Sequence, residues 1–244
     1  MLTMPIELPI RYRKARAWMA SFPCPLSALS RLLPDPSLRA VSVLPGVAPL
    51  TVAVFQCEDT SIGAHAEVVL GFPVRHRKST AVPLVALLAE RWLIDLGVWV
   101  HLLAVDSAAA ESAAKETWGL PAVSTKIAID VRVDRASCTV ADDDGAIFSV
   151  DFDRPTAPSE PMHFPLRLWS KRAAELLRTD LDVDAVGSLR RVGSRARLTI
   201  EDHPRVAAFR SLNLHRASAL EVRWLDAYRT ALDVPAARFL SETS

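Results

Sequence analysis

Two titratable residues share one face of a predicted strand in the first third of the chain. The segment 64–72 reads AHAEVVLGF, and side-chain alternation in a strand places Glu67 on the same face as His65 and Val69. A carboxylate in apolar surroundings has a raised pKa and can act as a general acid or base, and a neighbouring histidine can relay its proton. Structural roles stay open: Glu67 pairing with an arginine, and His65 packing in the core.

Aromatic residues and a further histidine lie on the next predicted elements. In segment 97–105, GVWVHLLAV, parity puts Trp99 and His101 on one face. They could form an aromatic wall for a flat ligand, although core packing is the stronger expectation. Trp118 follows in a turn, where packing is its first expected role.

Signatures of metal and cofactor sites are missing from the sequence. The aspartates 142–144 precede Gly145 and indicate a turn, because the later ligand positions of a calcium loop are absent. His203, in EDHP, is expected beside a helix cap. There is no zinc spacing, phosphate-binding glycine loop or G-x-S-x-G motif. We therefore expect no metal and no cofactor.

Composition places the chain among ordinary globular proteins. It has 244 residues, 50% of them hydrophobic, with 29 basic against 28 acidic side chains. We expect a single domain spanning residues 1–244, without nucleic-acid or membrane partners. The three cysteines are far apart, the N-terminus lacks the pattern of a secretory signal, and charged residues interrupt the longest apolar stretch, 84–105. These features predict a cytoplasmic protein.

Short segments rich in β-branched residues, separated by proline, glycine and aspartate, predict a protein dominated by strands. Two helices are expected at 25–33 and 107–118 and a short one from Pro204, while the proline-rich segment 154–165 is expected to be an exposed connection. The fold class is therefore α+β, mainly antiparallel β. Strands are expected at 38–44, 50–57, 64–72, 97–105, 124–133, 136–141, 146–152, 194–202 and within 215–228.

Four segments resemble the acetoacetate decarboxylase family in the correct order along the chain. They are SRLLPDPSL, DTSIGAHAEVVLGFPV, AVDSAAAESAAKETWGLP and ARLTIEDHP. The resemblance implies an antiparallel β-barrel or cone that encloses a central pocket, with a few helices outside. It also implies a small-molecule substrate and a homo-oligomer. Glu67 falls on the family's pocket glutamate, and His65 takes an aromatic position.

The chain departs from the family where the family's chemistry is performed. Family members carry two lysines after the proline of the turn, and the first forms an imine with a ketone. Here Ala122 and Val123 follow Pro121, so imine catalysis from that position is impossible. By loose alignment, a family arginine falls near Pro23 and a second pocket glutamate near Ala53. The pocket is either adapted to another ligand or released from selection.

Strand parity from Ala122 extends the expected pocket to Ser124 and Lys126. Lys126 returns to the face of Ala122, displaced by about 13 Å along a strand. The expected ligand pocket therefore comprises His101, Trp99, Trp118, Ala122, Ser124 and Lys126.

Three functions remain open. The first is an enzyme acting on a β-keto, polyketide-like or other secondary metabolite by lysine-independent proton transfer through Glu67 and His65, in a cyclisation, dehydration or decarboxylation. The second is a non-catalytic small-molecule binding protein or pseudoenzyme. The third is a decarboxylase that uses Lys126 to form an imine.

Overall fold

The central element of the computed structural model is a closed barrel of seven strands, and the structure describes residues 7–77, 96–191, 195–212, 214 and 217–241. The barrel closes because β5 pairs with β4 as well as with β10. The β5–β10 pair is parallel, and the other neighbours are antiparallel. In order round the barrel the strands are β4 (His65–His76), β3 (Val47–Thr60), β1 (Ile10–Pro25), β13 (Glu221–Leu232), β11 (Glu175–Arg190), β10 (Glu160–Arg172) and β5 (Gly97–Val105).

Along β4 and β5 the barrel wall is buried on both faces, whereas the outward-facing residues of β11 are exposed. In β4, Val68 and Leu70 face an outer core, whereas Val69 and Glu67 face the interior. This pattern follows from the two-residue period of a strand between two apolar layers.

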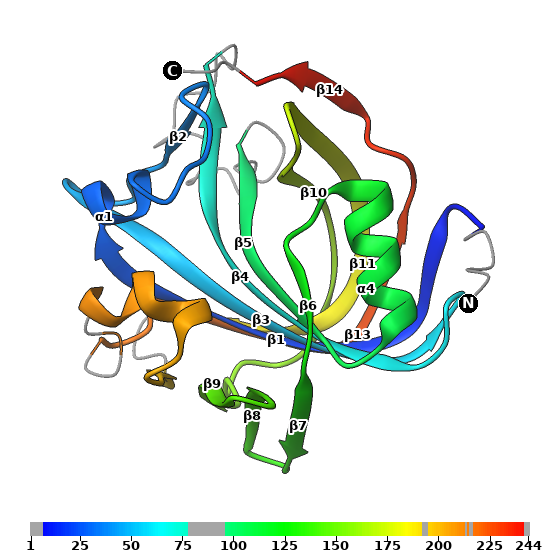
Figure 1. Ribbon diagram of the computed structural model, residues 1–244. Helices are drawn as coiled ribbons and strands as arrows, with labels where there is room; N and C mark the ends of the chain where they lie inside the picture. Colours follow the sequence, from blue (N-terminus) through cyan, green and yellow to red (C-terminus); the bar gives the residue numbers. More distant parts are fainter. Residues whose placement is uncertain (1–6, 78–95, 192–194, 213, 215–216, 242–244) are drawn as a thin grey trace.

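One helix covers the inner side of the barrel. Helix α4 (Ala108–Trp118) begins after Ser107, whose hydroxyl accepts a hydrogen bond from the Ala110 amide, and ends at Gly119 with φ 58°. Its alanines let the helix approach the wall closely, and the helix lies within the curve of the sheet (Figure 1). Helix α4 thus forms one side of the barrel interior.

A second sheet packs on the outside of the barrel (Figure 1). Its strands run in the order β12 (Ala196–Ile200), β9 (Gly145–Asp153), β8 (Arg135–Asp142) and β7 (Lys126–Val131). The remaining elements are α1 (Leu26–Ser30), η1 (Pro204–Leu212), β2 (Leu38–Ala40), β6 (Ala122–Ser124) and β14 (Ala237–Leu240). Within the described residues, no helix is long and apolar enough to cross a membrane.

The predicted fold class, mainly antiparallel β in a barrel, is confirmed. Three barrel strands were not predicted: β1 and β11 were not expected, and β10 includes the second half of the predicted exposed connection 154–165. Pro161 and Pro165 are tolerated in β10 because only Leu168 and Trp169 of that strand pair with β5. Part of the apolar stretch, 84–95, lies outside the described residues, as do 194 and 215–216.

A glycine allows the close approach of β11 to β13. A Cβ at Gly187 would lie 2.2 Å from the Trp224 carbonyl oxygen and 2.8 Å from the Leu225 Cα, next to a register shift in the pairing of the two strands. Because the obstacles are backbone atoms, Gly187→Ala should lower the free energy of unfolding by about 2 kcal/mol, as measured by urea denaturation.

The matched control is Ser188→Ala, because the Ser188 hydroxyl is buried and has no hydrogen-bond partner among the described residues. This variant should be no less stable than the wild type. Equal stability of Gly187→Ala and the wild type would contradict the proposed steric constraint.

Candidate functional site

The barrel encloses a cavity of about 160 Å³. Its walls are mostly apolar side chains from the strands and from α4. Six lining residues carry polar groups within this surface: Tyr12, Glu67, Glu221, Arg223, Tyr228 and Thr230. The cavity therefore suits a small, largely apolar ligand with few polar attachment points.

Glu67 is held at the cavity wall through one of its two carboxylate oxygens. Oε1 accepts a hydrogen bond from the Tyr12 hydroxyl at 2.8 Å and lies 2.7 Å from His65 Nε2. Among the described residues, no side chain or amide donates to Oε2. Oε2 is thus the oxygen that remains for a proton or a ligand.

His65 lies behind Glu67 and is fully buried, whereas the Glu67 side chain is 14% exposed. Burial lowers the pKa of His65, but the hydrogen bond and the charge of Glu67 outweigh burial, and the net pKa is raised above 6.5. Its Nδ1 lies 2.9 Å from the Gly63 carbonyl oxygen, so Nδ1 carries a proton and donates it. His65 therefore donates from Nδ1 to the backbone and presents Nε2 to Glu67 Oε1.

Two tyrosines complete the polar group at this end of the cavity. Burial raises the pKa of Tyr12, and the charge of Glu67 raises it further. The same two causes raise the pKa of Tyr228, which also lines the cavity. Both phenols stay protonated at neutral pH, and the Tyr12 hydroxyl donates to Glu67.

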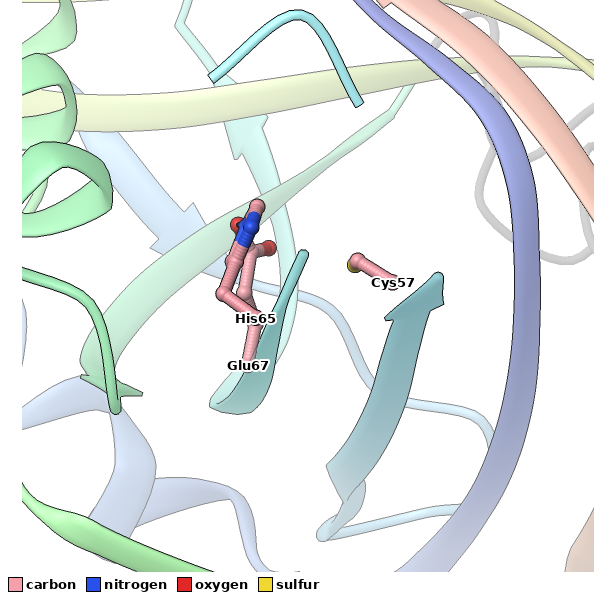
Figure 2. A group of neighbouring side chains, drawn as sticks. All are labelled: Cys57, His65 and Glu67. Atoms are coloured by element: carbon pink, nitrogen blue, oxygen red, sulfur yellow. Dashed lines mark hydrogen bonds and ion pairs between the residues drawn. The ribbon is translucent and has the colours of Figure 1, made fainter. Parts of the chain in front are cut away.

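Cys57 joins His65 and Glu67 in a group whose potential metal-ligand atoms all lie within 4.8 Å of one another. Figure 2 shows His65 and Glu67 extending together from β4 and Cys57 on the neighbouring strand β3. Burial, and then the nearby carboxylates, raise the pKa of the Cys57 thiol, so it stays protonated. The group is therefore a hydrogen-bonded cluster with a thiol beside it.

A second such group contains Asp142, Asp144 and His203. His203 Nε2 lies 3.0 Å from one Asp142 oxygen, and Arg205 donates to the other. The hydrogen bond from Arg205 lowers the pKa of Asp142 to about 2. The Arg205 amide donates to His203 Nδ1 at the start of η1, so His203 does lie at a helix cap.

Two of the predicted pocket residues lie in the barrel interior. Trp118 lines the cavity, and its Nε1 donates to the Asp233 carbonyl oxygen at 2.7 Å. Ala122 is buried in the same hydrophobic cluster and pairs with Leu103, a lining residue, but it does not itself line the cavity. Ala122, which the resemblance aligns with the family's lysine, therefore lies in a closed, apolar part of the wall.

Lys126 and Ser124 do not line the cavity. Strand β6 ends at Ser124, and after Thr125 the chain enters β7 of the second sheet, so parity counted from Ala122 does not apply to Lys126. Lys126 is exposed and forms an ion pair with Asp143 at 2.8 Å. The predicted inward orientation of Lys126 was wrong.

Trp99 and His101 share a face, as parity predicts, but it is the outer face of the barrel. Trp99 lies in the outer core, and the centre of the His101 ring lies 4.9 Å from the centre of the Phe209 ring of η1. A register shift in the β4–β5 pairing leaves Val100 and Leu103 facing the cavity on either side of His101. Trp99 and His101 therefore form no wall of the cavity.

Sequence reasoning missed the polar lining residues of β1 and β13. Tyr12, Tyr228, Glu221 and Arg223 were overlooked because β1 was not expected to be a strand and the alternation in 221–225, EVRWL, was not used. In that segment Glu221 and Arg223 alternate with the outward-facing Val222 and Trp224. The alternation was the available signal.

The His65–Glu67 pair makes a pH-dependent prediction. Because the pKa of His65 is raised above 6.5 in the fold, the pair's contribution to stability is full below pH 6.5 and is lost as the pH rises through the folded pKa. Glu67→Gln should lower the His65 pKa in an NMR titration, and should destabilise the protein more at about pH 6 than at about pH 9.

Glu58→Gln is the control. Glu58 forms surface ion pairs with Lys14 and Arg16, so the effect of Glu58→Gln on the free energy of unfolding should be similar at both pH values. An unchanged His65 pKa in Glu67→Gln would contradict the coupling.

Comparison with solved structures gives the same fold at low sequence identity. A structure of acetoacetate decarboxylase has a TM-score of 0.66 at 12% identity, covering 100% of this chain and 97% of that chain. Acetoacetate decarboxylase from Legionella pneumophila subsp. pneumophila str. Philadelphia 1 has a TM-score of 0.64 at 14% identity, covering 98% and 94%. The enduracididine biosynthesis enzyme MppR, complexed with pyruvate, has a TM-score of 0.65 at 12% identity, covering 98% and 92%.

No curated protein sequence matches this chain. The sequence model of the acetoacetate decarboxylase (ADC) family, however, matches residues 3–234, which is nearly the whole chain. With this match and the shared barrel, the chain belongs to the acetoacetate decarboxylase family.

Proposed function

We propose that this protein is an enzyme that transfers a proton to or from a carbon next to a carbonyl group, with Glu67 as the catalytic acid or base and no covalent lysine. Its substrate is a small β-keto, polyketide-like or related secondary metabolite, and the reaction is a cyclisation, dehydration or decarboxylation. The observation that carries the proposal is the orientation of Glu67. Its Oε1 is held by Tyr12 and His65, and its Oε2 is left for the substrate.

The surroundings of Glu67 support a role in proton transfer. As a base, its Oε2 would take a proton from the carbon next to the carbonyl, leaving an enolate. Tyr228 has a protonated hydroxyl at the same end of the cavity and is a candidate donor to the enolate oxygen. His65 acts as a positioning residue, because it holds Oε1 from behind.

The structural neighbours support a carbonyl substrate. MppR has been solved with pyruvate and with the condensation product of pyruvate and imidazole 4-carboxaldehyde. A similar barrel also occurs in an acetoacetate decarboxylase-like enzyme from Sphingomonas wittichii RW1, with a TM-score of 0.59 at 13% identity, covering 99% of this chain and 98% of that chain. The fold thus houses more than one kind of enzyme.

A non-catalytic binding protein is the second candidate, favoured by the apolar wall at Ala122. The third, imine chemistry at Lys126, has no support from the position of that side chain on the surface. A cytoplasmic location and a homo-oligomer complete the proposal. The three cysteines are buried and unpaired, which agrees with a reducing compartment.

Lysine-free chemistry predicts the absence of a trapped imine. The lining residues of the described chain include no lysine, so incubation with acetoacetate or longer β-keto acids followed by borohydride should leave the intact mass unchanged. A family member that carries both lysines is the positive control. An adduct that maps to Lys126 would overturn the lysine-free mechanism.

Proton transfer itself is tested by hydrogen exchange in D₂O. Short ketones and β-keto acids should exchange the protons next to their carbonyl group in the presence of the protein, as followed by proton NMR. Glu67→Gln should slow this exchange at least about 100-fold, because a positioned general base contributes a factor of this order.

Glu58→Gln changes a surface carboxylate of β3 and should catalyse hydrogen exchange of the ketones at the wild-type rate. If the wild type binds these compounds, as seen by thermal stabilisation, but catalyses no exchange, the protein is a binding protein.

A further inference from the structure

The barrel interior contains a second charged group, on a strand far from Glu67. Glu221 and Arg223 of β13 both line the cavity, while the intervening Val222 packs in the outer core. The Arg223 side chain is only 13% exposed. An arginine stays charged at any physiological pH, so this side of the cavity carries a permanent cation.

The cation is held in place and only partly engaged. Arg223 Nη2 donates to Glu221 Oε1 at 3.2 Å, and the guanidinium carbon lies 5.3 Å from the centre of the Phe164 ring. Glu221 also pairs with Arg191 at 3.4 Å, so its carboxylate is shared between two guanidinium groups. A guanidinium has five N–H donors, and its planar edge matches a carboxylate.

The strand register separates Arg223 from Glu67. Arg223 pairs with Met19, Met19 with Ala53, and Ala53 with Val69, which lies two residues from Glu67 on the same face. Three strand spacings correspond to roughly 14 Å along the wall between β13 and β4. Met19, Ala53 and Val69 line the cavity between the two charged groups, so that stretch of wall is apolar.

We propose that Arg223 binds a carboxylate at the end of the substrate that is remote from the carbon acted on by Glu67. Resting on the function proposed above, this inference narrows the substrate class to an oxo acid whose carboxylate and reactive carbonyl are separated by an apolar segment. Glu221 holds the guanidinium and competes with the substrate for it. The carboxylate at Arg223 is retained and is not lost as carbon dioxide.

Binding measurements with paired probes test the proposal. Straight-chain carboxylates from butanoate to octanoate, and the neutral amides of the same lengths, are titrated into the protein by isothermal calorimetry. The wild type should bind at least one carboxylate at least tenfold more tightly than its amide. Arg223→Met should weaken binding of that carboxylate at least tenfold and leave amide binding unchanged, whereas Glu221→Gln should strengthen carboxylate binding.

Arg167→Met is the matched control, because Arg167 lies on barrel strand β10 but pairs with Asp180 outside the cavity lining. It should leave both affinities unchanged. Circular dichroism checks that Arg223→Met is folded, and Arg223→Lys replaces it if it is not; Lys keeps the charge but loses the planar fork, and should weaken carboxylate binding less.

Equal binding of carboxylate and amide to the wild type, an unchanged preference in the folded Arg223 variant, or no binding of either probe would overturn the proposal. These results are separate from the exchange experiment. If hydrogen exchange depends on Glu67 but carboxylates bind no more tightly than amides, only the proposed role of Arg223 is excluded. If carboxylates bind selectively but no hydrogen exchange is seen, the proton-transfer function is excluded and the protein has a binding site for organic acids.

Discussion

The enclosure of the barrel interior by apolar side chains is the constraint on which the rest of this structure depends. A polar side chain that points inward cannot reach bulk water freely, so it must find its hydrogen bonds within the wall. Glu67 satisfies this requirement through Tyr12 on β1 and His65 on its own strand. The geometry of the carboxylate is therefore fixed by barrel closure.

The same constraint explains the separation of the two charged groups. Each charged group has partners of its own. Glu67 is hydrogen-bonded to His65 and Tyr12, and Arg223 contacts Glu221 and the Phe164 ring. The wall between them is apolar because a further polar group there would need partners of its own. An interior with two partnered polar groups and an apolar stretch between them can orient a ligand that is itself polar at both ends.

Strand parity within a single element was enough to predict that His65 and Glu67 of β4 lie side by side, but not how other predicted residues face the barrel interior. Glu67 and His65 do share a face and do touch, as alternation in 64–72 predicts. Lys126 was misplaced because the chain changes sheets at Thr125, and Trp99 and His101 were misplaced because parity shows which residues share a face but not which face points inward. Neither the change of sheets nor the choice of inward face has a signal in local composition, since both are set by pairing with distant strands.

The fold class was predictable from strand content and from the resemblance of four segments to a known family, but the residues of β1 and β13 were not. Those strands lie at opposite ends of the chain and pair with each other through nine residue pairs, a contact that local sequence patterns do not encode. The glycine–tryptophan contact between β11 and β13 likewise depends on the closed barrel. The missed lining residues are those brought into the interior by long-range pairing.

The register irregularity in β5 affects how such an interior can change over evolutionary time. With one residue accommodated beside His101, the inward positions on either side are aliphatic, and the imidazole is kept outside against Phe209. Deleting His101, the unpaired residue, would not change which side chains face inward, because Val100, Leu102 and Leu103 keep their partners on β4. A bulge in a wall of this kind therefore lets a single residue be inserted or deleted without an exchange of the inward and outward side chains.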